Sequence, residues 1–153
     1  GVIFYLSAYT FMNLGAFGII SMIENKDEGN LSLYDYSGLG NKKPMLAALL
    51  AIFMFALAGI PPFAGFFGKY YVFIAAIESN LTWLAIVGVL SSVISIYFYL
   101  RVVVVMYFQK DENILHVEDS SPALLGIMIS ALLVIVMGIA PGSIINLISN
   151  FVK

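Results

Sequence analysis

The sequence predicts an all-α integral membrane protein with about four transmembrane helices, the second of them discontinuous, followed by a short amphipathic C-terminal tail. The first observation is composition: 61% of the residues are hydrophobic and 10% are charged, whereas soluble proteins have about 45–50% and about 25%. The second is that apolar residues gather in long stretches separated by polar segments. The third is a pair of prolines inside the second stretch, where a helix cannot continue.

Composition also excludes several classes of site. The chain has no cysteine, so disulfides, thiolate metal sites and cysteine nucleophiles are excluded. Its basic residues form no cluster of the kind that binds nucleic acid. The chain begins at Gly1 with an apolar stretch and no preceding basic region, so we expect no signal peptide and interpret the sequence as a piece of a longer polypeptide.

The first apolar stretch, residues 2–23, is long enough to cross a hydrocarbon core of about 30 Å. Gly15 and Gly18 are small residues that allow helices to pack closely in a membrane. Tyr9 and Asn13 are polar, and a buried amide needs a hydrogen-bond partner. For Asn13, a structural and a functional role are both open at this point.

The second stretch, residues 45–77, contains the most informative pattern in the chain. Pro61 and Pro62 end a helix, and Gly59 and Gly65 beside them permit backbone angles that other residues resist. As one straight helix the stretch would be roughly 50 Å long, too long for a core of about 30 Å. Either two short spans meet at the prolines, or one span consists of two half-helices around an unwound middle.

The distribution of lysines favours a single, discontinuous crossing. Such a crossing places residues 24–43 and 109–121 on the same side of the membrane, which then carries Lys26, Lys42, Lys43 and Lys110 and leaves Lys153 opposite. Positive charge concentrates on one side of membrane proteins. Two crossings would move Lys110 to the other side and weaken this asymmetry.

Two further spans follow, at residues 81–108 and 122–140, before an amphipathic tail that starts after Pro141. Arg101 lies near the end of the third span. It either extends to the membrane surface or is a buried charge that needs an ion-pair partner. The single histidine, His116, lies in a polar segment and does not indicate a metal site.

Lys69, just beyond the prolines, is the candidate proton-transferring residue. Burial disfavours the ammonium form of a lysine, which makes proton exchange accessible. Unwound backbone inside a membrane frees carbonyl groups and admits water. Tyr70, Tyr71, Asn13 and Tyr9 are candidate members of a proton wire to this lysine. The alternative for Lys69 is a structural ion pair with another helix.

Several segments resemble a known family in both motif order and spacing: residues 5–9 (YLSAY) with 14–18 (LGAFG), 35–39 (DYSGL), 57–62 (LAGIPP) with 65–71 (GFFGKYY), and 95–101 (SIYFYLR). They are similar to the antiporter-like membrane subunits of proton-pumping NADH:quinone oxidoreductase (respiratory complex I). The similarity covers nearly the whole chain and is to the C-terminal part of the subunit N family. The related L and M subunits and the Mrp-type cation/proton antiporters share part of the pattern, but subunit M usually has a glutamate where this chain has Lys69.

The resemblance implies a function and a setting. Residues 1–153 would form a single membrane domain, a fragment of a longer antiporter-like subunit that contributes part of a transmembrane proton channel in the bacterial inner membrane. Its partners would be the other membrane subunits of complex I and the lipid bilayer. NADH, FMN, iron–sulfur clusters and quinone would be bound by partner subunits, with no redox centre in this chain. The family's first repeat, with its own broken helix, is missing.

Two other classes of function are alternatives to proton transfer. A passive membrane scaffold predicts that Lys69→Ala leaves transport intact and affects only assembly. An intramembrane enzyme, such as a protease, needs paired acids or a serine–histidine set within the spans. The apolar stretches contain neither.

Overall fold

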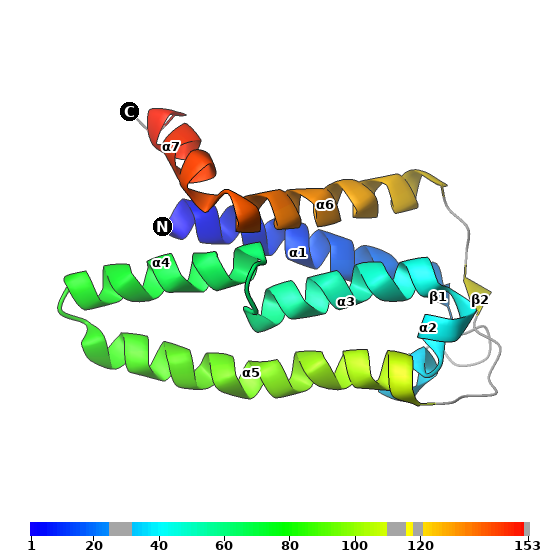
Figure 1. Ribbon diagram of the computed structural model, residues 1–153. Coiled ribbons are helices and arrows are strands. Elements are labelled where there is room, and N and C mark those ends of the chain that lie inside the picture. Colours follow the sequence, from blue (N-terminus) through cyan, green and yellow to red (C-terminus); the bar gives the residue numbers. More distant parts are fainter. Residues whose placement is uncertain (25–31, 110–115, 118–120, 152–153) are drawn as a thin grey trace.

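The computed structural model describes residues 1–24, 32–109, 116–117 and 121–151. Its main elements are helices: α1 (Val2–Met22), α3 (Pro44–Ala58), α4 (Ala64–Glu78), α5 (Thr82–Phe108), α6 (Ser121–Ile139) and α7 (Pro141–Phe151) (Figure 1). The polar segments contain the short helices η1 (Leu33–Tyr36) and α2 (Leu39–Lys42) and two strands of two residues each, β1 (Ile23–Glu24) and β2 (His116–Val117).

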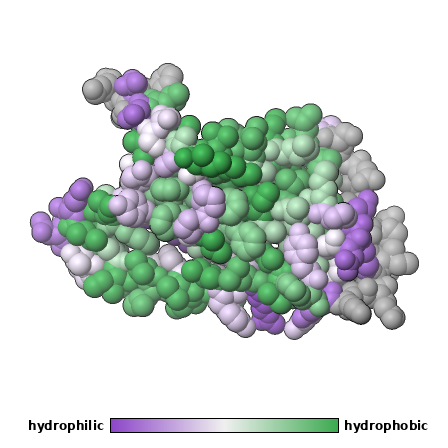
Figure 2. Space-filling view, in the orientation of Figure 1, coloured by the Kyte–Doolittle hydropathy of each residue, from purple (hydrophilic) through white to green (hydrophobic). Residues whose placement is uncertain are grey.

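Three helices are long and apolar enough to cross a membrane: α1, α5 and the part of α6 from Pro122 to Ile139. Helix α3 is a shorter apolar helix. Hydrophobic residues cover most of the face shown in Figure 2, and hydrophilic residues gather mainly at its ends. The predicted all-helical membrane fold is therefore confirmed, and the predicted spans at 2–23, 81–108 and 122–140 agree closely with α1, α5 and α6.

The two polar segments meet at one end of the bundle. Strands β1 and β2 pair in antiparallel orientation, with Ile23 opposite Val117. The Ser37 hydroxyl group also lies 3.5 Å from the side-chain oxygen of Gln109. The prediction of a single crossing depended partly on Lys26, Lys110 and Lys153, which lie outside the described residues.

A capping box fixes the short helix η1 before α3. Ser32 and Asp35 form a capping box around η1, in which the Ser32 backbone N–H donates to the Asp35 carboxylate over 2.6 Å. Tyr36 is buried at the end of η1. Burial, together with the nearby Asp35 carboxylate, raises the pKa of the Tyr36 phenol above its usual value. Helix η1 therefore packs against α5 as part of the bundle.

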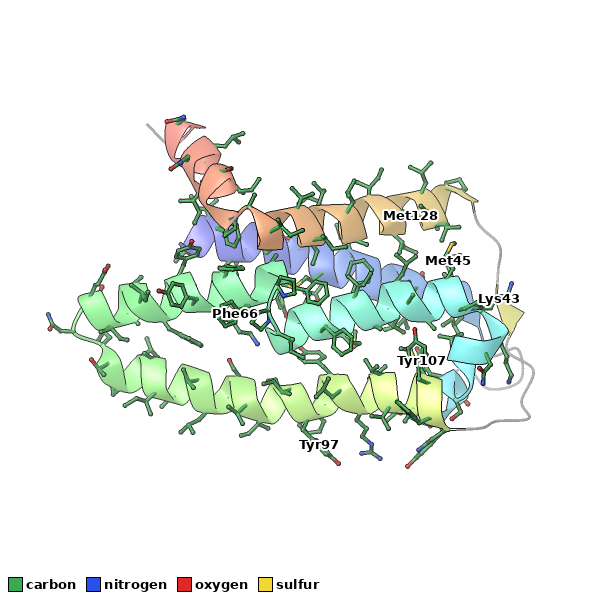
Figure 3. The ribbon with its side chains drawn as sticks, viewed as in Figure 1. Lys43, Met45, Phe66, Tyr97, Tyr107 and Met128 are labelled. Atoms are coloured by element: carbon green, nitrogen blue, oxygen red, sulfur yellow. The ribbon has the colours of Figure 1, made fainter. Side chains whose placement is uncertain are left out.

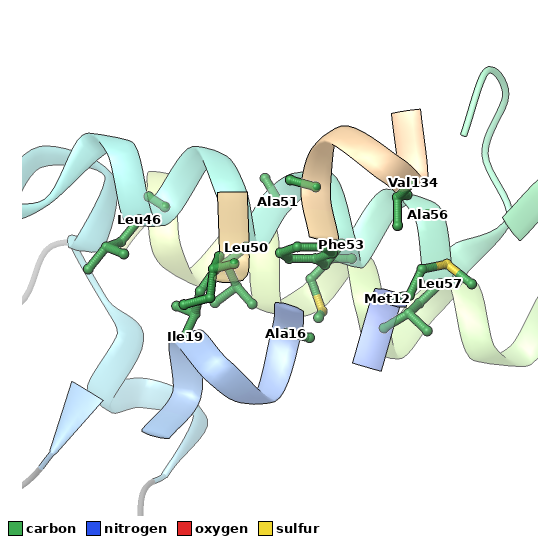
Figure 4. Close-up of a cluster of buried hydrophobic side chains, with 14 of the residues drawn as sticks. Met12, Ala16, Ile19, Leu46, Leu50, Ala51, Phe53, Ala56, Leu57 and Val134 are labelled. Carbon is green, nitrogen blue, oxygen red and sulfur yellow. The ribbon is translucent and has the colours of Figure 1, made fainter. Parts of the chain in front are cut away.

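The core lies where α3 packs against α1 and α6. Figure 4 shows Phe53 and Leu50 of α3 among side chains of α1 and α6, including Val134. Gly15 of α1 must be a glycine, because a Cβ atom there would overlap the Phe53 ring. Small residues on α1 thus allow the close helix packing that the sequence predicted.

Helices α3 and α4 lie between α5 and the pair formed by α1 and α6 (Figure 1). They follow one another along the bundle, and α4 is displaced sideways where α3 ends (Figure 1). The candidate site described below is lined by residues of α1, α3, α4 and α5.

Candidate functional site

Helix α3 ends in a Schellman motif. Gly59 has a left-handed backbone conformation, with φ +82°, which glycine adopts without strain. The Ile60 N–H donates to the Phe55 carbonyl over 3.0 Å, and the Gly59 N–H donates to the Ala56 carbonyl over 3.0 Å. These two bonds are the pair that defines the motif, so the backbone itself satisfies two of the last four carbonyls of α3.

The break between α3 and α4 is shorter than the sequence predicted. It includes the cis Pro61–Pro62 bond, but α4 already begins at Ala64. Gly65, expected in the unwound part, therefore lies in the first turn of α4. Its role is close packing, because a Cβ atom there would overlap the Ala56 carbonyl.

Helix α6 also packs closely against the break between α3 and α4. A Cβ atom at Gly138 would overlap the Pro62 carbonyl and lie 2.7 Å from the carbonyl carbon of Phe63. Figure 3 shows Phe66, near the start of α4, beside this point. Glycines on α4 and α6 thus let two backbones approach the broken segment, which fixes the position of α4 relative to α3.

Lys69 supplies hydrogen bonds to the remaining carbonyls at the C-terminal end of α3. Its Nζ atom donates to the Leu57 carbonyl over 3.0 Å and to the Ala58 carbonyl over 3.2 Å. These are the two carbonyls that the Schellman motif leaves without a partner. A cation is also favoured at the C-terminal end of a helix, where the dipole is negative. Lys69 therefore caps the helix that precedes its own.

The lysine side chain is half-buried. Within the described part of the chain, no carboxylate lies within ion-pair distance of Lys69. The structural alternative of an ion pair with another helix thus has no partner among these residues. The backbone carbonyls of a broken helix take the place of an acidic side chain.

Lys69 also borders a cavity of about 210 Å³. The residues that line the cavity include hydroxyl-bearing side chains from two other helices, Tyr5 and Tyr9 of α1 and Ser91, Ser92, Ser95 and Tyr99 of α5. The Ser92 and Ser95 hydroxyls donate to the carbonyls of Gly88 and Ser91, both over 2.9 Å. Their oxygen lone pairs remain able to accept a hydrogen bond. A cavity of this size and polarity can hold several water molecules.

The structure brings only one of the predicted wire residues to this cavity. Tyr9 lines it, and its ring stacks on that of Tyr5 with centroids 5.8 Å apart. Asn13 instead donates to the Tyr9 carbonyl over 2.8 Å and lines a separate groove along α1. Tyr70 is 50% exposed, and it packs on its neighbours Phe66 and Tyr71. Asn13 and Tyr70 therefore do not line the cavity beside Lys69, and their place in a proton wire stays a prediction.

Arg101 is exposed and donates to the Tyr34 hydroxyl group over 3.2 Å. Within this chain alone Arg101 is not buried, and its role as a buried charge stays a prediction. Tyr34 belongs to η1, so the guanidinium group lies where the polar segment folds along α5. That position agrees with the other interpretation, in which the long side chain reaches the membrane boundary.

Sequence reasoning missed most of the hydroxyl groups around Lys69. Ser91, Ser95 and Tyr99 follow one another at intervals of four residues, which places them on one face of α5. Tyr5 and Tyr9 have the same spacing on α1. Polar stripes of this kind on otherwise apolar membrane helices were the available signal.

Residues 1–95 match the model of a family described as "NADH:quinone oxidoreductase/Mrp antiporter, TM". The chain belongs to this family. Together with the three long apolar helices, this makes it a multi-pass membrane protein of the bacterial inner membrane.

The individual relatives are named as subunits of NADH-quinone oxidoreductase. The chain is 45% identical to the NADH-quinone oxidoreductase subunit N of Trichlorobacter lovleyi, covering 100% of this chain and 32% of the relative. It is 47% identical to subunit N 1 of Chloroherpeton thalassium, over 95% and 30% of the two chains. It thus spans about a third of the length of the curated relatives it matches.

A solved structure has a similar fold. The chain aligns with a chain of the respiratory complex I of Thermus thermophilus with bound aureothin, with a TM-score of 0.79 and 28% identity. The alignment covers 91% of this chain and 32% of the other. The overall helix arrangement of this chain therefore resembles that of a chain in this respiratory complex.

Proposed function

We propose that this chain forms part of a proton channel in the membrane arm of an NADH:quinone oxidoreductase, and that Lys69 takes up and releases the transported proton. The observation that carries the proposal is the position of Lys69, between the carbonyls of a broken helix and a hydroxyl-lined cavity. The names of the curated relatives support the assignment to this enzyme.

We further propose that residues 1–153 form one membrane domain in which α3 and α4 together make a single discontinuous crossing. Two observations support this. The polar segments before α3 and after α5 lie at the same end of the bundle. Helices α3 and α4 follow one another along the bundle instead of forming a hairpin (Figure 1). With α1, α5 and α6, this gives four crossings.

The cap on α3 lets Lys69 change its protonation state without losing its position. A neutral amine has two N–H bonds and one lone pair, whereas an ammonium group has three N–H bonds. The two bonds to the Leu57 and Ala58 carbonyls can therefore persist in both states. The remaining direction on the nitrogen, a lone pair or a third N–H, then exchanges the proton with the cavity.

Two opposing effects keep both the neutral amine and the ammonium ion of Lys69 accessible. Burial favours the neutral amine, and the negative end of α3 favours the ammonium ion. A change in nearby charge, supplied from elsewhere in the enzyme, can then load or discharge the lysine. Tyr9 and its neighbouring hydroxyl groups would carry the proton onward through water in the cavity.

Redox chemistry is assigned to partner subunits in this proposal. The chain has no cysteine and hence no thiolate for an iron–sulfur cluster. Its described residues contain no group of His, Cys, Asp and Glu side chains suited to a metal. NADH, FMN, iron–sulfur clusters and quinone would be held by other subunits, and further membrane subunits would adjoin this chain.

The experiment is proton pumping by inside-out membrane vesicles that carry Lys69→Ala in the assembled complex, with NADH oxidation followed in parallel. We expect an assembled complex that oxidises NADH but pumps fewer protons per NADH. Arg101→Ala is the matched control, since it removes one positive charge outside the cavity. A normal pumping ratio in Lys69→Ala would reject the proposal and favour a passive scaffold.

A further inference from the structure

A second cavity, of about 230 Å³, lies at the end of the bundle where the polar segments meet. Its lining includes Met22, Lys42, Lys43, Met45, Leu46 and Leu124. Met22 ends α1, Lys43 precedes α3, and Leu124 lies in the first turn of α6. Because three helices begin or end here, this cavity lies at the boundary between the membrane spans and the polar segments. We refer to it as the boundary cavity.

The boundary cavity is separate from the candidate proton site. It lies at the N-terminal end of α3, whereas Lys69 binds the C-terminal end of that helix. The 15 residues of α3 correspond to about 22 Å of helix. None of the residues around the boundary cavity has a role in the proton path proposed above.

The lining combines positive charge with apolar surface. Lys42 and Lys43 supply two ammonium groups, and Met22 and Leu46 form a buried apolar wall. Met45, beside them, is 51% exposed and lies at the start of the apolar helix α3. Helix α3 has no acidic residue in its first turn, so the positive end of its dipole adds to the charge of the lysines. An amphipathic anion matches this combination better than a small inorganic one.

We propose that the boundary cavity binds the phosphate-bearing headgroup of an anionic phospholipid. The lysines would contact the phosphate, and Met45 and Leu124 would contact the start of the acyl chains. The level of the cavity supports a lipid, since a headgroup in the bilayer lies at this boundary. Lysine-rich segments also mark the cytoplasmic side of a membrane protein, where anionic lipids attract basic residues.

The test uses a photo-crosslinking residue, p-benzoylphenylalanine, in place of Met45 in the assembled complex. The complex is placed in nanodiscs with equal amounts of phosphatidylglycerol and phosphatidylcholine, and the crosslinked lipid is identified by mass spectrometry. We expect labelling by phosphatidylglycerol to exceed labelling by phosphatidylcholine about thirtyfold, as two lysines at a membrane surface would produce. Met128 provides the control position, because it is exposed on α6 (Figure 3) but does not line the cavity. We expect no preference there.

Charge variants test the role of the lysines. Lys42→Gln with Lys43→Gln should abolish the preference at Met45, and Lys42→Arg with Lys43→Arg should retain it. If the double glutamine variant fails to assemble, the two single variants provide the same comparison. Equal labelling by both lipids, or a crosslink to a neighbouring subunit instead of lipid, would overturn the proposal. Loss of the lipid label on addition of inorganic phosphate would also overturn it, since the site would then be one for free anions.

Discussion

The Nζ atom of Lys69 lies 3.0 Å from the carbonyl oxygen of Leu57, a residue twelve positions earlier on the preceding helix. This hydrogen bond joins the two helices across the break and gives one side chain two tasks. It satisfies the end of α3, and it holds a protonatable nitrogen at a polar cavity.

Removing the donors of Lys69 should destabilise the break. Lys69→Met keeps much of the apolar side chain but leaves the Leu57 and Ala58 carbonyls without a donor. An unsatisfied buried polar group costs about 1–3 kcal/mol, so we expect a loss of about 2 kcal/mol in this half-buried site. The thermal unfolding midpoint of the detergent-solubilised complex measures it. An unchanged midpoint would mean that water replaces the lysine cap at no cost.

Gly59→Ala should destabilise the C-terminal end of α3 for a different reason. The left-handed conformation at φ +82° costs a residue with a Cβ atom about 1–2 kcal/mol. The added atom would also lie 3.2 Å from Cδ of Lys69. We expect lower thermal stability together with impaired pumping.

The control for this change is Gly126→Ala on α6. A Cβ atom at Gly126 meets nothing within 4 Å, and alanine favours a helix by about 1 kcal/mol over glycine. This variant should be as stable as the parent or more so. Equal stability of the Gly59 and Gly126 variants would contradict the assigned backbone requirement.

Tyr9→Phe should slow proton transfer without affecting assembly. The change removes one hydroxyl group from the Lys69 cavity and keeps the ring that stacks on Tyr5. Loss of about one hydrogen bond, roughly 1 kcal/mol, corresponds to about a fivefold lower rate. Proton pumping per NADH oxidised, measured at a limiting driving force, is the readout. Tyr70→Phe makes the same chemical change outside the cavity and should have no effect; equal effects of the two variants would argue against the cavity as the path.

The all-helical fold and its three long apolar helices could be predicted from the sequence, because the relevant signals are local. Long apolar stretches predicted α1, α5 and α6, and consecutive prolines predicted where α3 ends. The position of Gly65 was predicted wrongly, because helix α4 can restart directly after Phe63. Nothing local distinguishes a glycine in a break from one that permits close packing against Ala56.

The composition of the site depended on contacts that the sequence does not display. Lys69 stood out as a lone cation in an apolar stretch, but its carbonyl partners are defined only once α4 folds beside the end of α3. Asn13 was a plausible neighbour by residue type, yet its amide is satisfied by the carbonyl of Tyr9 within its own helix. Ser95 and Tyr99 line the cavity beside Lys69 because α1, α3, α4 and α5 pack around it. That packing is a tertiary feature, which the sequence does not display.

The most direct measurement is the ratio of protons pumped to NADH oxidised in vesicles that carry Lys69→Arg. Arginine can still donate to the Leu57 and Ala58 carbonyls and keeps the positive charge, but it does not release its proton in proteins. The account predicts an assembled complex of near-normal stability in which this ratio falls as it does for Lys69→Ala. A normal ratio in the arginine variant would show that capping α3 is the whole role of Lys69, and that the proton takes another path.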